Sequence, residues 1–269
     1  KWEITIPRDS PGARASHTCP VVDFDHDGSD EFFIGERCLR FRDGSPLFIA
    51  DEHVWDGHSD VTAPFWREDL EKWWLFTARE TPYAAPAPPR VVCFGENGRR
   101  RWSDLEDGHM DMGWVAKFKP GQTIAYALRL CSKQAGPNGV DRTGEEFFWD
   151  AETGERRRMQ FAAFERFPVD VDGDGFHELV PTNSVQCPRQ IHDGSGPLLA
   201  TLPEGSRVAH ASHFVDAPGE QLVVYQPDGR IQIWGLKGQS QTAASARYDH
   251  PFYQRNRKLT AVGYNLTGL

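Results

Sequence analysis

The sequence predicts an all-β protein, a β-propeller of four-stranded blades, from its composition and from an internal repeat. Its 269 residues include 25 Gly and 19 Pro, with 17 Phe and 9 Trp, which is typical of short strands separated by tight turns. Apolar segments of strand length start near residues 21, 64, 115, 168, 214 and 260, at intervals of about 43 to 53 residues. Repeats of this size that contain several short strands are typical of propeller blades.

Two acidic segments show the repeat most clearly. Residues 21–35 read VVDFDHDGSDEFFIG and residues 168–181 read PVDVDGDGFHELVP, so each places alternating aspartates between two apolar strands. Weaker copies of this pattern occupy residues 63–78, 113–130 and 213–226, and a sixth copy starts at residue 258. We therefore expect about five to six blades in one propeller domain over residues 1–269, with no amphipathic helix. A two-sheet sandwich is the alternative fold, but it does not require a recurring four-stranded unit.

The composition argues against several classes of protein. The formal net charge is −9, which disfavours a general nucleic-acid-binding protein, because such proteins need a basic face. No apolar run approaches the roughly 18–20 residues that span a bilayer, so we expect no membrane segment. The 5 Cys are well separated in the sequence and allow at most two internal disulfides.

One five-residue pattern occurs twice. Residues 56–60 read DGHSD and residues 107–111 read DGHMD, which puts His58 and His109 at the same point of consecutive repeats, just before the first strand of a blade. Loops at this point open on one face of a propeller, whereas the acidic segments lie in turns on the opposite face. Two copies on one face favour a site over a repeated structural turn. We therefore predict that both histidines face one pocket.

The same register brings further polar residues to this face. Residues at the start of the other blades are predicted to bind substrate: His17, Arg166, His210, His213 and Arg257. Three long connections also open here, and long loops in a compact domain are usually functional. Residues 77–90 supply Arg79 and Tyr83, residues 128–146 supply Arg129 and Arg142, and residues 181–194 supply Asn183.

Imidazole, guanidinium and phenol groups together suit the cleavage of an acidic polysaccharide or oligosaccharide. In β-elimination of a uronate, a base removes the proton at C5 and an acid protonates the leaving oxygen at C4. The C5 proton becomes acidic only when the neighbouring carboxylate is neutralised by an Arg or a metal ion. The predicted catalytic residues are His58, His109, Tyr83, Arg79 and Arg129, and Asn183 joins the substrate-binding group.

These features resemble the β-propeller polysaccharide lyases, which include rhamnogalacturonan lyases, ulvan lyases and lyases that cleave rhamnosyl-glucuronate. The resemblance rests on the acidic turns, the DGHxD pattern, GHMDMGW at residues 108–114 and LTAVGYN at residues 259–265, and it extends from about residue 15 to the C-terminus. It implies a secreted or periplasmic enzyme that uses His and Tyr as base and acid. By motif position, only His58 and His109 carry over to these roles. Such lyases usually have seven or eight blades, so either the propeller is small or the chain lacks N-terminal blades, which a second chain or fragment would supply.

The acidic segments predict structural Ca²⁺ sites, because alternating carboxylates on a short Gly-containing turn offer hard oxygen ligands. The predicted ligands are Asp23, Asp25 and Asp27 in the first segment, and Asp170, Asp172 and Asp174 in the second. A turn held only by Asx hydrogen bonds is the alternative. A Zn²⁺ site formed by His17, Cys19, Cys187 and His192 is a further hypothesis.

Two other functions fit parts of the pattern. A non-catalytic, Ca²⁺-stabilised propeller for glycan binding or adhesion would show acidic turns in nearly every blade, whereas only two are intact here. A glycoside hydrolase would need a pair of carboxylates on the histidine face, which Asp60 and Asp111 would supply.

Overall fold

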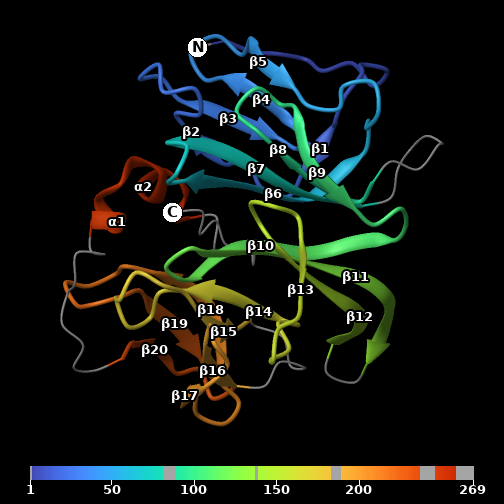
Figure 1. Ribbon diagram of the computed structural model, residues 1–269. Coiled ribbons are helices and arrows are strands. Elements are labelled where there is room, and N and C mark those ends of the chain that lie inside the picture. The colour runs from blue at the N-terminus through green and yellow to red at the C-terminus, as the bar shows by residue number, and fades with distance from the viewer. Residues whose placement is uncertain (1, 81–88, 137–138, 183–188, 237–245, 259–269) are drawn as a thin grey trace.

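The computed structural model describes residues 2–80, 89–136, 139–182, 189–236 and 246–258, and these residues are mostly in β-strands. Within each sheet the strands that follow one another in sequence pair antiparallel, and the described residues form five consecutive sheets (Figure 1). The all-β prediction is confirmed, and so is the recurring four-stranded sheet. The propeller arrangement of these sheets stays a prediction.

The sheets are meanders that use the strands in chain order. The first contains β2 (Val21–Val22), β3 (Glu31–Ile34), β4 (Arg37–Arg40) and β5 (Pro46–Ile49). The second contains β6 (His58–Arg67), β7 (Lys72–Arg79), β8 (Val91–Phe94) and β9 (Arg100–Asp104), with β1 (Ala15–Ser16) added parallel to β6. The third contains β10 (His109–Lys119), β11 (Gln122–Gly136), β12 (Gly139–Asp150) and β13 (Arg156–Arg157). The fourth contains β14 (Arg166–Val169), β15 (Glu178–Pro181), β16 (Gln190–Asp193) and β17 (Leu198–Thr201), and the fifth contains β18 (Arg207–Ser212), β19 (Gln221–Tyr225) and β20 (Ile231–Trp234).

Hydrophobic clusters fill the space between consecutive sheets. Successive side chains of a strand point to opposite faces, so a middle strand can supply both of its neighbouring clusters. In β7, Leu75 packs toward the first sheet and Phe76 toward the third. In β15, Leu179 packs toward the third sheet and Val180 toward the fifth. Burial on both faces explains why these strands appear in the sequence as continuous apolar runs.

Strands occupy predicted loops in two parts of the sequence, the two DGHxD segments and the long connection that follows residue 128. The strands β6 and β10 begin at His58 and His109, not near residues 64 and 115, so the two histidines are the first residues of strands. Residues 128–136 and 139–146 form the paired ends of β11 and β12, where Lys133 lies opposite Arg142. In both places the side chains are polar, so the sequence lacks the apolar pattern that indicates a strand. The strands continue there because pairing with a neighbouring strand satisfies the backbone N–H and C=O groups.

Two short helices were not expected, α1 (Ala246–Asp249) and α2 (Pro251–Asn256). The N-terminus of α2 is capped by the His250 side chain, which accepts a hydrogen bond from the backbone N–H of Phe252. Asn256 accepts a hydrogen bond from the backbone N–H of Val21 and donates one to the Val21 carbonyl. The α2 helix therefore satisfies backbone groups at the edge of the first sheet. Neither helix is long enough to show an apolar periodicity.

No helix in the described residues is long and apolar enough to cross a membrane. Residues 259–265 of the predicted sixth copy lie outside the described residues.

Four of the cysteines lie in the described residues and carry free thiols: Cys19, Cys38, Cys93 and Cys131. Burial raises the pKa of the Cys38 and Cys93 thiols, so both are held in the protonated form. Cys187 lies outside the described residues.

The helices meet the fourth and fifth sheets at a buried carboxyl group, Glu220. Its Oε1 accepts a hydrogen bond from the Tyr253 hydroxyl at 3.0 Å, and its Oε2 accepts one from the backbone N–H of Asp170 at 3.1 Å. The side chain is almost inaccessible to solvent, and burial raises the Glu220 pKa from 4.5 to about 7. Folding therefore favours the protonated carboxyl.

A raised pKa in the folded state gives Glu220 a stabilising contribution that is present below pH 4.5 and lost as the pH rises through about 7. The free energy of unfolding of the wild type should fall between pH 5 and pH 8, and that of Glu220→Gln should fall by about 2 kcal/mol less. Urea unfolding at several pH values measures this difference. Glu204→Gln, at an exposed position, is the control and should follow the wild type. The same change in the free energy of unfolding with pH in the wild type and in Glu220→Gln would contradict the prediction.

Candidate active site

The two histidines of the repeated pattern meet at one carboxylate. His58 begins β6 and His109 begins β10, and Glu80 follows the end of β7. The Nδ1 atom of His58 lies 2.9 Å from Glu80 Oε2, and the Nε2 atom of His109 lies 3.3 Å from Glu80 Oε1. Glu80 is fixed in place because its backbone N–H donates to the His58 carbonyl at 2.9 Å. The structure therefore brings the two histidines together, while their catalytic role stays a prediction.

A third histidine joins this group through β1. The parallel pairing of β1 with β6 places Ala15 opposite His58, and the chain then carries His17 over the His58 ring. The two ring centroids are 4.6 Å apart in an edge-to-face arrangement. The Nε2 atom of His17 is 3.6 Å from Asp60 Oδ1, and about half of the His17 side chain is exposed. His17 was predicted to bind substrate, and it lies beside the two predicted catalytic histidines.

Each part of the DGHxD pattern has its own position. The first aspartates are ion-paired outside the cluster, Asp56 with Arg14 and Asp107 with Arg129, both at 2.8 Å. The last aspartates lie where the pairing of β6 with β7 and of β10 with β11 shifts register. Such β-bulges often re-aim side chains beside active sites. The bulges let Asp60 and Asp111 point at the histidines.

Asp60 is the buried centre of the cluster. Its carboxylate is 3 % exposed, and Oδ1 lies 3.1 Å from the Nδ1 atom of His58. Burial raises the Asp60 pKa, and the neighbouring His58 opposes this. The Asp60 carboxylate in turn raises the pKa of His58, against the effect of burial. His58 therefore keeps its proton to a higher pH than an ordinary imidazole.

One guanidinium borders the cluster on the side of Asp111. The Nη1 atom of Arg142 lies 3.7 Å from Asp111 Oδ2 and 3.6 Å from Glu165 Oε1. Arg142 is on β12, and Glu165 precedes β14 with a positive φ of 55°. The hydroxyl of Thr182 donates to Glu165 Oε2 at 3.1 Å. The sequence placed Arg142 near this face without assigning it a role, and it gave no signal for Glu80 or Glu165.

The donor set could also hold a metal ion. Two groups have one ligand atom per residue within 4.8 Å of one another: His17, His58 and Asp60, and Asp60, His109 and Asp111. Asp111 Oδ2 is buried without a hydrogen-bond partner, and the buried Asp60 Oδ1 faces the rings of His58 and His17 at 3.1 and 3.6 Å. Asp60, Glu80, Asp111 and Glu165 outnumber the guanidinium groups of Arg142 and of Arg90, whose Nη1 donates to the Glu80 carbonyl, so these residues carry a net negative charge when the histidines are neutral. That excess favours the binding of a proton or a cation.

Known structures share this fold. No family model and no curated protein matches the sequence. The exotype rhamnogalacturonan lyase YesX matches 94 % of this chain with a TM-score of 0.71 at 17 % identity, over 42 % of its own length. The rhamnogalacturonan lyase YesW and a Bacillus licheniformis rhamnogalacturonan lyase match 94 % of this chain with TM-scores of 0.66 and 0.67, at 16 % and 17 % identity, each over 41 % of its length. The chain has the fold of a part of these lyases. It spans about two-fifths of their length.

Arg79 and Arg129 lie apart from the histidines. The Arg79 guanidinium is completely buried and bonded to Glu36 and Asp51, so it cannot reach a substrate. Arg129 is ion-paired with Glu145 and Asp107 and lies over the ring of Phe147. We therefore assign Arg79 a structural role, and the described contacts of Arg129 lie outside the cluster. Tyr83 and Asn183, also predicted for the site, lie outside the described residues.

For the remaining predicted substrate-binding residues, the structure shows contacts with groups other than His58 and His109. Arg166 is buried and donates to the Ala162 carbonyl, and His210 lies within β18 with its ring against Phe214. His213 follows β18 and therefore belongs to a turn of the acidic type, where it stacks on Tyr248. Arg257 is the C-cap of α2. The predicted positions of His210 and His213 before the first strand of the fifth sheet were wrong, because that strand starts at Arg207, earlier than its apolar pattern suggests.

The acidic segments lie where they were predicted, between β2 and β3 and between β14 and β15. Asp23, Asp25 and Asp27 bring one oxygen each within 4.8 Å of one another. In the second segment the group consists of Asp170, Asp172 and Glu178, in place of Asp174. For the Zn²⁺ hypothesis, His192 is bonded through Nδ1 to the Gly196 carbonyl, and neither Cys19 nor His192 belongs to a metal-binding group of described residues.

Proposed function

We propose that this chain carries the active site of a secreted polysaccharide lyase that cleaves a uronic-acid-containing glycan by β-elimination, and that its sheets are blades of a β-propeller. One observation carries the proposal: His58 and His109, from neighbouring sheets, share Glu80 and have a guanidinium on one side. The fold that the chain shares with rhamnogalacturonan lyases supports the same reaction class. An acidic polysaccharide is the proposed partner.

The proposed reaction needs a base that removes the proton at C5 and an acid that protonates the oxygen leaving C4. His109, a third exposed, takes the C5 proton, and the electron pair forms the C4–C5 double bond. The leaving oxygen at C4 takes a proton from His58, whose pKa is raised by Asp60. Arg142 binds the uronate carboxylate and stabilises the charge that develops at C5. Glu80 and Asp60 orient the two imidazoles.

The donor set also fits a divalent cation, because buried carboxylate oxygens of Asp60 and Asp111 lie within 4.8 Å of the histidine nitrogens. His17, His58 and Asp60, or Asp60, His109 and Asp111, would hold it. A bound cation would supply further positive charge for the uronate carboxylate. Activity that survives dialysis against EDTA would leave Arg142 as the neutralising group.

Product analysis on a panel of rhamnogalacturonan, ulvan and gum-type glycans separates the candidate functions. A lyase produces new reducing ends together with the ultraviolet absorbance of an unsaturated uronate. A glycoside hydrolase that uses Asp60 and Asp111 would produce reducing ends without that absorbance. A binding module would leave every glycan intact and would be retarded in a gel that contains its ligand. We expect the first result on at least one glycan, and either of the others would overturn the proposal.

A further inference from the structure

The two acidic loops, residues 23–31 and 170–178, share four internal hydrogen bonds. The first aspartate accepts from the Gly at the sixth position, Gly28 or Gly175, at 3.2 Å in both loops. The final glutamate accepts from the backbone N–H of the second residue, at 2.9 Å from Glu31 and 2.8 Å from Glu178. In both loops the aspartates at the third and fifth positions each accept a hydrogen bond from the backbone N–H two residues later. Local sequence therefore builds the two loops in the same way.

The loops differ at their eighth position. The first loop has the carboxylate of Asp30, and the second has His177. His177 is buried, and its Nδ1 contacts the backbone of Lys117. The second loop thus has one carboxylate fewer for a cation.

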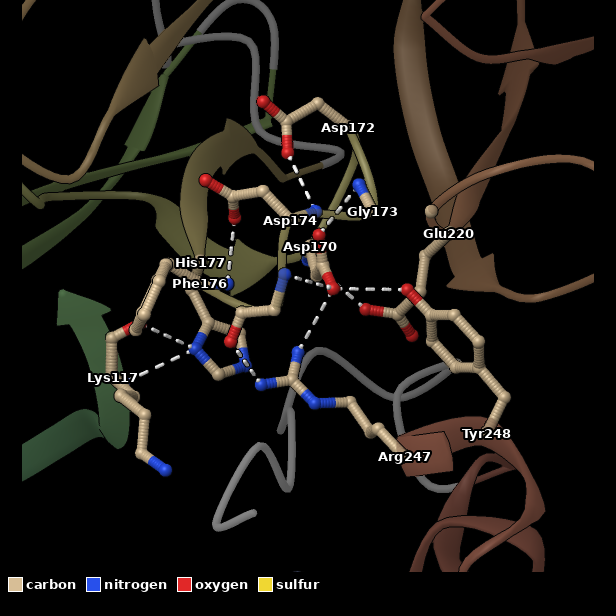
Figure 2. Close-up of polar contacts among 12 residues, drawn as sticks. Lys117, Asp170, Asp172, Gly173, Asp174, Phe176, His177, Glu220, Arg247 and Tyr248 are labelled. Carbon is tan, nitrogen blue, oxygen red and sulfur yellow. Dashed lines mark hydrogen bonds and ion pairs between the residues drawn. The ribbon is translucent and has the colours of Figure 1, made fainter. Parts of the chain in front are cut away.

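The second loop also receives a side chain from far along the sequence. Figure 2 shows the Arg247 guanidinium of α1 pointing into it. The Nη1 atom lies 3.3 Å from Asp170 Oδ2, and Nη2 donates to the Gly175 carbonyl at 2.7 Å. The Tyr248 hydroxyl donates to the same Asp170 oxygen at 3.0 Å. Asp170 Oδ1 accepts from the backbone N–H of Gly173, so both oxygens of this buried carboxylate have donors.

The first loop keeps oxygen atoms that have no donor. Asp23 Oδ1, Asp30 Oδ1 and Glu31 Oε1 are buried and have no hydrogen-bond partner. Glu31 is 0 % exposed, so its unpartnered oxygen is a buried acceptor within the loop. Arg255 of α2 reaches only the outer oxygen of Asp30, at 2.8 Å. Buried unpaired acceptors are costly unless a ligand satisfies them.

We propose that Arg247 is the built-in cation of the second acidic loop, so that Ca²⁺ binds at the first loop and not at the second. A Ca²⁺ ion at Asp170 would have to displace the guanidinium or lie beside a like charge in a buried position. The contact also anchors α1 to the loop that joins β14 and β15. This proposal concerns calcium binding and does not rest on the proposed lyase activity.

Matched variants at the third position of each loop test the proposal. Asp25 and Asp172 each accept one backbone N–H within their loop, and Asn keeps an acceptor while it removes the charge. By equilibrium dialysis of the whole chain with Ca²⁺, Asp25→Asn should lose one Ca²⁺ relative to the wild type, and Asp172→Asn should lose none. Loss of a Ca²⁺ from Asp172→Asn would overturn the proposal. A wild-type protein that binds no Ca²⁺ would overturn its first-loop part.

A second variant tests the role of Arg247 directly. Arg247→Gln removes the charge at Asp170, and we expect the variant to bind one Ca²⁺ more than the wild type. Adding Asp172→Asn to Arg247→Gln should remove this extra ion. In the absence of Ca²⁺, Arg247→Gln should also speed amide hydrogen exchange in residues 246–256, and added Ca²⁺ should not restore the anchored helix. An unchanged Ca²⁺ count in a folded Arg247→Gln variant would show that Arg247 does not exclude the metal.

Discussion

His58→Ala and His109→Ala should each lower lyase activity by about 10²–10⁴-fold, because each removes a group that transfers a proton in the proposed reaction. Both variants should fold, since each imidazole is at the start of a strand and outside the hydrophobic clusters. The initial rate of formation of the unsaturated product measures the effect. Thermal unfolding confirms that the loss is not a loss of fold.

His53→Ala is the matched control, because His53 is an exposed histidine in the turn before β6. It should keep the wild-type rate. The double variant should be about as slow as the slower single variant, because residues that act in one step are not additive. Wild-type rates in both single variants would show that the cluster at Glu80 is not the catalytic centre.

Arg79→Met should lower the free energy of unfolding by about 3–5 kcal/mol, since it leaves a buried carboxylate without its partner. Arg79 donates from Nε and Nη2 to the two oxygens of Glu36, at 2.8 and 2.6 Å, and both side chains are 0 % exposed. Nη2 also donates to Asp51 at 2.7 Å, and Nη1 donates to the Pro89 carbonyl at 3.0 Å. Urea unfolding at neutral pH measures the change.

Arg100→Met is the matched control for Arg79→Met. Arg100 binds the same Asp51 carboxylate, but its side chain is one-third exposed. An exposed ion pair contributes at most about 1 kcal/mol, so Arg100→Met should lower stability only slightly. If the two variants were equally stable, the buried ion pair would not support the fold. If Arg79→Met kept its stability and lost only activity, Arg79 would belong to the site after all.

Strand order and the acidic loops could be predicted from the sequence because both depend on neighbouring residues. Apolar runs and Gly-containing turns specify hairpins locally, and the alternating aspartates form their hydrogen bonds within the loop. The repeated DGHxD pattern likewise predicted that His58 and His109 would meet. The start of β6 was predicted less well, since its first residues are polar and are placed by pairing with β1 and β7.

The sequence by itself determined the all-β class, the consecutive four-stranded sheets and the position of the repeated histidines. Tertiary structure alone decided which charged groups face the cluster and which are buried as ion pairs. Arg79 and Glu80 are adjacent in the chain, yet Arg79 forms a buried ion pair with Glu36 and Glu80 lies between His58 and His109. Arg247 reaches Asp170 across 77 residues of sequence. Such partners depend on how separate sheets and helices pack, because a charge is stabilised by whatever lies within a few ångströms of it, and residue spacing does not contain that information.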